Sequence, residues 1–510
     1  MSALESPDRP RRRILLIVAP VLALVALIAW GYSSPVGSAP DDDFHLVSIW
    51  CGGASAANEC QPGAKNDERI VPRDLVFDAK CYSYKPAKSA ACQGKDFGVR
   101  PQDTVSTDRG NFTGLYPPVF YFVMSVFAGP NIDVSVLAMR IFNSFLFVGW
   151  IVLLWFLIPP SRRRQLVIGF AVTLVPLGMS LIPSTNPSSW AILAGGTLWL
   201  ALIGYFESTG WRRMALAGFA AVTLLIGAGA RSDAAVFAGV AIVVAVVFTM
   251  RRERRYWLTA LFTLGLLIIA ILFFVSAQQS GAVSSGLGTV GTEPAAITTA
   301  GNIEANTILM PGLWVGIFGL NGWGIGWLDT PIPIAAGVGA FLVFAGVVFW
   351  GLRTGSWRKW IAVLTVVFAM WLFPAVLLLQ TKSLVGAYVQ PRYILPLMTI
   401  LAGVILMKVV NDPLSRPQRL VAVVALSIAN SLAMALNMRR YITGTDVIGL
   451  NLNSHAEWWW PGFFLSPMAV WAIGTLAFAG ALVALDKGLF GRGRLSPGFA
   501  VAAMGEARQG

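Results

Sequence analysis

Stretches of about 20 apolar residues recur along the whole chain, separated by short breaks rich in arginine. A helix needs roughly 20 such residues to cross a hydrocarbon core of about 30 Å. Of the 510 residues, 56% are hydrophobic and only 12% are charged, which excludes an ordinary soluble domain. The sequence therefore predicts an all-α polytopic membrane protein.

The apolar stretches predict twelve transmembrane helices. They are expected at residues 14–32, 134–157, 165–182, 189–206, 214–230, 234–250, 257–276, 331–352, 360–379, 393–410, 420–437 and 464–485. The first stretch is long for the apolar region of a signal peptide, and no convincing cleavage site followed by a soluble body is present. We therefore expect it to be retained as the first spanning helix.

The positions of the basic residues predict the orientation of these helices. Lysine and arginine concentrate in cytoplasmic loops, and with twelve spans the basic clusters all fall on one side. The clusters are Arg162 to Arg164, Arg212 with Arg213, Arg251 to Arg255, Arg353 with Arg358 and Lys359, Arg416 with Arg419, and Lys487 with Arg492 and Arg494. Both termini are then expected in the cytoplasm. Because the net charge of +13 arises mainly from these loops, membrane lipids and not nucleic acid are the expected partners.

This topology divides the chain into seven parts. In order, they are a cytoplasmic N-terminus (1–13), the first helix (14–32), an outer loop with a cap and an interfacial helix (33–130), helices two to seven (131–276), a second outer loop (277–330), helices eight to twelve (331–486) and a cytoplasmic tail (487–510). We expect a plasma-membrane location, with the functional site facing outside.

All four cysteines, Cys51, Cys60, Cys81 and Cys92, lie in the first outer loop. Disulfides persist in oxidising compartments, and four cysteines allow three connectivities. Proximity favours Cys51–Cys60 with Cys81–Cys92. A zinc site is the alternative, but these spacings are not those of zinc knuckles.

Two further apolar segments on the outer side are expected not to span the membrane. The apolar segment that ends at Gly129-Pro130 has only about 12 residues, which is too short to cross a bilayer and fits an interfacial or re-entrant helix. The segment 308–325 interleaves glycine with tryptophan, and glycine weakens a helix. We expect a re-entrant or surface-lying segment there; an ordinary extra span is the alternative.

Placing a charged residue near or inside a membrane costs free energy, so each such residue is a functional candidate. Arg140, Arg231, Asp233 and Arg392 are all expected in the outer half of the membrane, on the same side as an acidic triplet at residues 41–43. Arginine beside carboxylates suits a phosphate-bearing lipid, because the guanidinium fork binds phosphate in a bidentate manner. Snorkelling, helix–helix pairing or solvation of a loop start are the structural alternatives.

The two histidines, His45 and His455, are far apart in sequence and form no metal motif on their own. His455 precedes Trp458 to Trp460, a run that marks the membrane interface. The chain has no Walker motif, no GxGxxG after a strand, no HExxH and no GxSxG. Hydrolase, ATPase and dinucleotide-binding functions are therefore not supported.

Five short strings, spread over most of the chain, resemble a bacterial family of multi-pass membrane proteins of unknown function. They are Pro40-Asp41-Asp42-x-x-His45, Tyr116-Pro117-Pro118, Asn186-Pro187, Gly326-Trp327-Leu328-Asp329-Thr330-Pro331 and Gln390-Pro391-Arg392-Tyr393-x-x-Pro396. That family in turn is similar to the GT-C superfamily of lipid-dependent glycosyltransferases. The chain departs at Pro391, where the family usually has glycine, and at Asp42, where glutamate is common.

The resemblance implies a GT-C-like architecture, a polyprenyl-phosphate-sugar donor and an envelope glycan or lipid acceptor. It implies that Asp41 or Asp42 is the catalytic base, although the acidic pair could instead be Asp42 and Asp43. Arg392 with Tyr393 is the first candidate for the leaving phosphate, and Arg231 is the second. The remaining expected substrate-binding residues are Asp43, His45, Arg140, Asp233, Asp329 and Gln390. A divalent metal ion is a possible cofactor, with no ligand set that decides it.

Two other functions are compatible with the sequence. A transporter or flippase of a lipid-linked intermediate would carry charged residues near the midplane and repeat-related broken helices. Here the ionisable residues gather at the outer rim and no internal repeat is clear, which favours an enzyme. A non-catalytic assembly factor for envelope synthesis is the third possibility.

Overall fold

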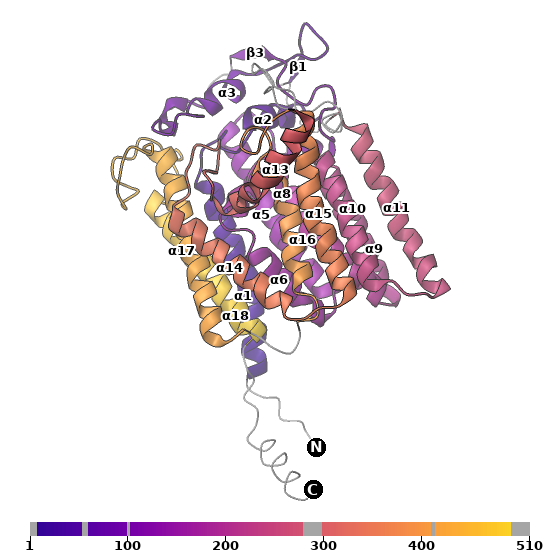
Figure 1. The fold of residues 1–510 in the computed structure, drawn as a ribbon. Helices are drawn as coiled ribbons and strands as arrows, with labels where there is room; N and C mark the ends of the chain where they lie inside the picture. The colour runs from indigo at the N-terminus through magenta and orange to yellow at the C-terminus, as the bar shows by residue number, and fades with distance from the viewer. Residues whose placement is uncertain (1–7, 54–59, 99–102, 279–297, 410–413, 491–510) are drawn as a thin grey trace, which may run out of the picture.

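The computed structural model describes residues 8–53, 60–98, 103–278, 298–409 and 414–490, which form a helical bundle with a small cap at one end (Figure 1). The helices of the first half are α1 (Asp8–Tyr32), α2 (Asp42–Trp50), α3 (Arg73–Val76), α4 (Val119–Ser125), α5 (Ile132–Leu157), α6 (Arg163–Ala171), α7 (Leu177–Leu181), α8 (Ser188–Glu207), α9 (Gly210–Ala228), α10 (Ser232–Thr249) and α11 (Arg254–Ser276). Those of the second half are α13 (Thr299–Val315), α14 (Ile334–Leu352), α15 (Trp357–Gln380), α16 (Leu395–Ile405), α17 (Arg416–Ile442) and α18 (Pro467–Phe490).

Within the described residues, ten helices are long and apolar enough to cross a membrane. They are α1, α5, α8, α9, α10, α11, α14, α15, α17 and α18. The expectation of a polytopic helical membrane protein is thereby confirmed. Each of the ten coincides with one of the twelve expected spans.

The other two expected spans are short helices in the structure. Residues 165–182 contain α6 and α7, which are separated around Pro176. Proline has no backbone N–H to continue the helical ladder, so the helix breaks there. Residues 393–410 contain α16, an eleven-residue helix in which every residue is buried. Neighbouring helices therefore enclose α16, whereas α6 is only partly buried.

The helix α8 lies at the centre of the bundle, and nearly all of its residues are buried. Close approach of its neighbours depends on small residues, as is common between membrane helices. A Cβ atom at Gly195 would lie 2.8 Å from the Cβ of Pro396 on α16. At Gly196 it would lie 2.1 Å from the ring of Phe170 on α6. These glycines therefore let α16 and α6 pack directly against α8.

The arginine-rich loops meet at one end of the bundle, the end at which α1 starts and α18 ends (Figure 1). Arg162 pairs with Glu207 at 2.5 Å, and Arg419 pairs with Asp486 at 2.5 Å. The guanidinium of Arg358 donates to the carbonyl oxygens at the end of α10. Loops far apart in sequence thus share one face, as the topology predicted from the basic residues requires.

The cap covers the opposite end and belongs to the first outer loop (Figure 1). It contains an antiparallel sheet in the order β1 (Gln61–Pro62), β2 (Arg69–Pro72) and β3 (Thr104–Thr107), together with the 3-10 helices η1 (Asp78–Lys80) and η2 (Ala90–Gln93). Disulfides join Cys51 to Cys60 and Cys81 to Cys92. The favoured pairing is confirmed, and all four cysteines of the chain are used.

The two apolar segments expected not to span the membrane both lie near the cap end. The first contains α4, a helix of seven residues. The second contains the end of α13 and a 3-10 turn, η5 (Gly316–Phe318), after which the chain reverses at Gly319 with φ 77°. Another 3-10 turn, η6 (Pro391–Tyr393), leads into α16. These elements surround the residues described next.

Candidate functional site

The acidic triplet stands at the start of α2, a helix enclosed between the cap and the bundle. Every residue of α2 is buried. Asp41 precedes the helix in the left-handed conformation, with φ 58° and ψ 25°. Non-glycine residues in this region are uncommon and cluster at functional sites, although aspartate tolerates the conformation better than most. The backbone is fixed beside it, because Asn186 Nδ2 donates to the carbonyl oxygen of Pro40 at 2.7 Å.

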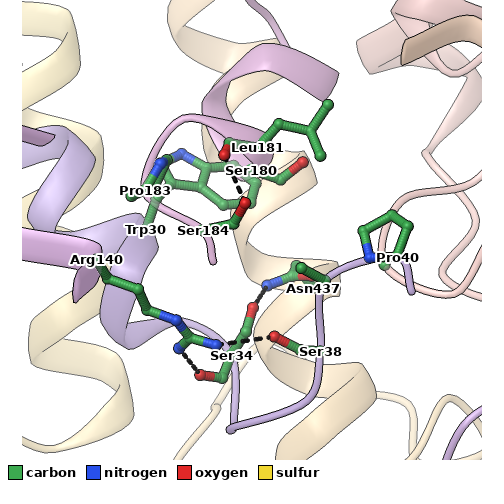
Figure 2. A pocket seen from close by; sticks show the side chains of 12 residues that line it. Trp30, Ser34, Ser38, Pro40, Arg140, Ser180, Leu181, Pro183, Ser184 and Asn437 are labelled. Atoms are coloured by element: carbon green, nitrogen blue, oxygen red, sulfur yellow. Dashed lines mark hydrogen bonds between the residues drawn. The ribbon is translucent and has the colours of Figure 1, made fainter. Parts of the chain in front are cut away.

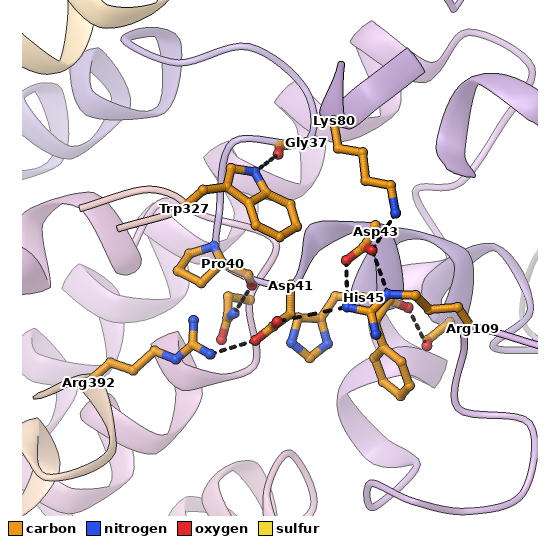
Figure 3. A network of polar contacts seen from close by, with 12 residues as sticks. Gly37, Pro40, Asp41, Asp43, His45, Lys80, Arg109, Trp327 and Arg392 are labelled. Atoms are coloured by element: carbon orange, nitrogen blue, oxygen red, sulfur yellow. Dashed lines mark hydrogen bonds and ion pairs between the residues drawn. The ribbon is translucent and has the colours of Figure 1, made fainter. Parts of the chain in front are cut away.

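Asp41 is the most accessible carboxylate of the triplet and pairs with Arg392 (Figure 3). Arg392 Nη2 lies 2.5 Å from Asp41 Oδ2, while 40% of the aspartate side chain remains exposed. Burial raises the pKa of Asp41, but the Arg392 guanidinium and other nearby charges outweigh burial and hold the pKa below its usual value. Asp41 is therefore ionised and reachable from outside the protein.

Asp42 is fully buried and both of its oxygens are used. Oδ2 accepts a hydrogen bond from the backbone N–H of Ala39 at 2.9 Å, and Oδ1 accepts one from the Thr185 hydroxyl at 2.7 Å. Burial raises the pKa of Asp42 to about 6. These contacts tie the start of α2 to the α7–α8 connection. Of the two predicted bases, Asp41 is the one whose carboxylate can meet a substrate.

Asp43 links α2 to the cap. Arg109, just after β3, forms a two-point contact with it, with Nε–Oδ2 2.5 Å and Nη2–Oδ1 2.9 Å. Lys80 Nζ lies 2.7 Å from Oδ2 (Figure 3). These cations keep the pKa of Asp43 below its usual value despite burial. Arg109 also reaches to 3.9 Å from Asp41. Asp43 therefore fixes the cap over the site, with two cations at its edge.

His45 lies one helical turn after Asp41, on the same side of α2. Its Nδ1 atom lies 2.9 Å from the hydroxyl of Tyr121 on α4. Burial lowers the pKa of His45 to about 3, so the imidazole is neutral at physiological pH. Its ring contacts Tyr116, with 5.5 Å between ring centroids. His45 can orient a ligand by hydrogen bonding, but it is a weak base.

Two arginines lie on the ring of Tyr393. The Cζ atoms of Arg231 and Arg392 are 5.1 Å and 5.2 Å from its centroid, within the range of cation–π attraction. Arg231 is also bound by Asp233 at both ends of its fork, with Nε–Oδ1 2.9 Å and Nη2–Oδ2 2.7 Å. Tyr116 lies on a further side of Arg231, 5.8 Å from its Cζ. Aromatic rings and a saturated ion pair thus position the second arginine beside the first.

Arg392 has two side-chain nitrogen atoms with unused hydrogen-bonding capacity. Its side chain is only 4% exposed, yet Nε and Nη1 have no hydrogen-bond partner in the described part of the chain. The buried Oε1 atom of Gln390, two residues earlier, also lacks a partner there. Leaving buried polar atoms unpaired costs free energy, about 1–3 kcal/mol each and more for charged groups. An anion that reached Arg392 would accept a hydrogen bond from one of these nitrogen atoms.

Arg140 contacts neither Asp41 nor Arg392 among the described residues, and its role is structural. Its guanidinium donates to the carbonyl oxygens of Gly31, Ser34 and Pro35 and to the Ser38 hydroxyl. It borders a polar cavity of about 20 Å³ (Figure 2), room for about one water molecule. Arg140 therefore supports the turn that leads from α1 to Asp41.

Asp329 also pairs away from Arg392. Its Oδ2 atom accepts from Arg440 Nη2 at 2.7 Å, and both side chains are buried. Arg440 donates in addition to the carbonyl oxygens of Tyr82 and Lys88 in the cap. Trp327, from the same turn as Asp329, donates to the carbonyl oxygen of Gly37 (Figure 3). This pair connects the cap, α17 and the turn before α14.

Several contributors to the site were not among the predicted site residues. Arg109 and Lys80 lie in the polar part of a long loop, and nothing in their local sequence distinguishes them from the other cations there. Tyr116 belongs to a string that was noticed, Tyr116-Pro117-Pro118, but an aromatic residue near a membrane is ordinarily interfacial. Tyr121 and Thr185 join the site only because α4 and the α7–α8 connection lie against α2.

The described residues provide no ready ligand set for a divalent metal. No three side chains from His, Cys, Asp and Glu converge among them. The carboxylates nearest the site, Asp41, Asp43 and Asp233, are each paired with arginine or lysine.

Comparison with known proteins identifies the family but not the activity. Among curated proteins and among solved structures, none matches the chain. Residues 24–401 match the model of a family described as predicted membrane protein DUF2142. The match includes Asp41, Asp233, Arg392 and Tyr393, and it covers well over half of the chain. This multi-pass membrane protein belongs to the DUF2142 family.

Proposed function

We propose that the protein is a membrane glycosyltransferase of GT-C type, which transfers a sugar from a polyprenyl-phosphate-sugar donor to a cell-envelope glycan or lipid acceptor. The observation that carries this proposal is the contact between Asp41 and Arg392. A partly exposed carboxylate lies 2.5 Å from a buried guanidinium. The guanidinium has two N–H-bearing atoms without a partner among the described residues. Sugar transfer from a phosphate needs one group of each kind.

The phosphate is assigned to Arg392. In the transfer, the bond between the sugar C1 and the phosphate oxygen breaks, and the phosphodiester monoanion becomes a phosphate monoester with a second negative charge. Cations placed where charge develops stabilise a transition state strongly in a site that excludes water. Arg392 Nε and Nη1 are free to donate to the leaving phosphate, and Arg231 adds positive charge across the Tyr393 ring.

The acceptor hydroxyl is assigned to Asp41. Its carboxylate removes the hydroxyl proton while the acceptor oxygen forms a bond to C1 on the face opposite the phosphate, which inverts the configuration. A general base of this kind contributes typically about 10²–10⁴-fold, and alignment of the two substrates supplies much of the rest. The acceptor approaches between Asp41 and the cap, past the exposed parts of Arg109 and Lys80.

Donor binding would make Asp41 a better base. In the free protein, the Arg392 guanidinium lowers the pKa of Asp41. A phosphate bound to Arg392 adds negative charge nearby, which opposes that effect and raises the pKa. The base would thus gain proton affinity only when the donor is in place. Without the sugar donor, the lowered pKa of Asp41 makes it a weak base toward the acceptor hydroxyl.

The distribution of basic residues supports a site on the outer face of the plasma membrane. Asp41 lies at the cap end, and the arginine-rich loops lie at the opposite end (Figure 1). Because basic loops remain in the cytoplasm, the cap would face outward. Two disulfides in the cap agree with an oxidising compartment on that side.

The test is a transfer assay with purified protein in proteoliposomes. The donors are synthetic polyprenyl phosphates that carry different single sugars, and the acceptors are envelope glycolipids and glycans. Glycosylated product and released polyprenyl phosphate are measured together. We expect both to form in equal amounts with one donor class, and both to be lost with Asp41→Asn.

The matched control is Asp67→Asn, the same substitution at an exposed carboxylate in the cap turn. It should leave transfer unchanged. If folded protein moves a labelled donor lipid between leaflets and forms no glycosidic bond with any acceptor, the protein is a flippase and the proposal is wrong. Transfer at the normal rate by Asp41→Asn would refute the assignment of the base.

A further inference from the structure

The segment between α17 and α18 exposes apolar side chains beyond the end of the bundle. Ile448 is 95% exposed, Leu450 is 92% exposed and Phe464 is 86% exposed. They exceed the exposure of every other large apolar side chain among the described residues. Two of them lie two positions apart on one turn. Exposed apolar groups gathered in this way usually mark a surface that binds a partner or a membrane.

The turn that carries Ile448 and Leu450 is fixed by hydrogen bonds. Arg439, at the end of α17, donates from Nη2 to the carbonyl oxygens of Gly449 at 2.9 Å and Asn451 at 2.7 Å. These carbonyls flank Leu450, so the arginine holds the turn from both sides. The guanidinium is buried to do so. Ile448 and Leu450 therefore extend from a turn whose backbone is held by Arg439.

The two flanking helices place this segment at the level of the membrane interface. Arg419 on α17 and Asp486 on α18 form an ion pair and so lie at the same depth, at the end with the basic loops. About 20 helical residues cross the hydrocarbon core. Counting that length from each member of the pair gives position 439 on α17 and position 466, immediately before α18. The connecting segment thus begins and ends at the opposite boundary.

Both flanking helices also expose apolar side chains within their candidate membrane spans. Val424 and Ile428 on α17 and Leu476 on α18 are exposed apolar residues within the spans. The connecting segment also contains Trp458, Trp459 and Trp460, of which Trp460 is buried and the other two are partly buried against the bundle. It contains no lysine or arginine between positions 443 and 466. Attachment through apolar insertion, without attraction to anionic headgroups, is what this composition favours.

We propose that the turn at residues 444–452 is a membrane anchor that inserts Ile448 and Leu450 into the lipid leaflet on the cap side. Its partner is the boundary between headgroups and acyl chains in that leaflet, with Phe464 at the same level. The proposal depends on the membrane-spanning fold and is independent of the reaction catalysed.

The anchor shares its support with the cap. Arg440, the residue after Arg439, donates to the carbonyl oxygens of Tyr82 and Lys88 and pairs with Asp329. At the end of α17, Arg439 therefore binds the anchor and Arg440 binds the cap. Anchoring would keep the cap, and with it the opening beside Asp41, at a fixed height above the leaflet.

The test uses a single reactive cysteine, which is possible because all four natural cysteines are in disulfides. Leu450→Cys and, separately, Ile448→Cys are labelled with an environment-sensitive fluorophore and placed in vesicles of a zwitterionic phospholipid. Quenching is measured with lipids that carry a spin label close to the headgroup and with iodide in the outer solution. The control is Lys65→Cys in the cap turn, whose side chain is 74% exposed.

We expect the labels at 450 and 448 to be quenched several-fold more by the spin-labelled lipid than the label at 65, and much less by iodide. Strong iodide quenching at both positions, equal to that at 65, would show a solvent-exposed turn and overturn the proposal. Protection from both quenchers would show that protein covers the turn, most simply a second copy of the chain, and would overturn it as well.

Discussion

Arg392 Nη2 lies 2.5 Å from Asp41 Oδ2, although 351 positions separate the two residues in sequence. The contact joins the residue before α2 to the turn before α16. The arginine keeps two further donor atoms free among the described residues, and the aspartate remains partly exposed.

Asp41→Asn should abolish most of the transfer activity while the protein folds normally. An amide cannot accept the acceptor proton, so we expect kcat to fall by about 10²–10⁴-fold, the usual contribution of a general base. The substitution changes no buried contact except that with Arg392. Initial rates at saturating donor and acceptor measure the effect. An undiminished kcat would exclude a proton-transfer role.

Asp42 should behave differently, because its carboxylate supports structure. Asp42→Asn keeps one oxygen for the Ala39 N–H and leaves an amino group that can donate to Thr185, so it should fold and retain activity. Asp42→Ala removes the partner of a buried N–H and should lower the free energy of unfolding by about 1–3 kcal/mol. Thermal unfolding in detergent distinguishes the two. Loss of transfer in a stable Asp42→Asn protein would move the base to Asp42.

The stability of the protein should depend on pH through Asp42. Its pKa is about 6 in the folded protein and 3.8 in the ordinary state, so between these values the folded form binds more protons. The stability that this group contributes is fully present below pH 3.8 and is lost as pH rises through 6. Relative to Asp42→Asn, the wild-type protein should therefore lose unfolding free energy between about pH 4 and pH 7. A pH-independent difference would contradict the raised pKa.

Arg392→Lys should impair catalysis more than charge alone would predict. Lysine keeps the positive charge but lacks the planar fork that binds phosphate at two points. We expect kcat/KM for the donor to fall by about 10²–10³-fold, the loss typical for a donor to developing charge. Steady-state kinetics at varied donor concentration measure it. Arg73→Lys, at an exposed position in the cap, is the matched control.

Arg392→Gln makes a further prediction about pH. Removing the cation removes the influence that lowers the pKa of Asp41, so that pKa should rise. The acid limb of the kcat/KM profile should then move to higher pH. If residual activity of the variant shows an unchanged acid limb, Asp41 is not the group that titrates.

Asp329→Asn should affect stability and not donor binding. Removing one partner of a buried ion pair leaves Arg440 uncompensated, which costs about 3–5 kcal/mol. We expect a clear fall in the unfolding temperature with KM for the donor unchanged in the protein that remains folded. A raised KM for the donor without loss of stability would show that Asp329 binds substrate and would contradict this prediction.

The sequence by itself determined the class of fold and the chemistry available to it. Long apolar stretches can only be accommodated as helices in a membrane, because every backbone polar group there must be satisfied within the segment. The distribution of arginine predicted which loops share one end, and the close spacing of the cysteines favoured the disulfide pairs that the structure shows. Hydropathy, basic-residue distribution and cysteine spacing depend on nearby positions in the sequence. They can therefore be predicted without knowing how the helices pack.

Tertiary structure decided which charged residues meet. Four arginines show this. Arg140 donates to backbone carbonyls, and Arg231 is paired with Asp233. Arg392 keeps unpaired donors beside Asp41, and Arg440 holds the cap. Such roles depend on contacts between segments hundreds of residues apart. Burial then sets the charge state and the accessibility of each group, and neither is encoded in the residue or in its neighbours along the chain.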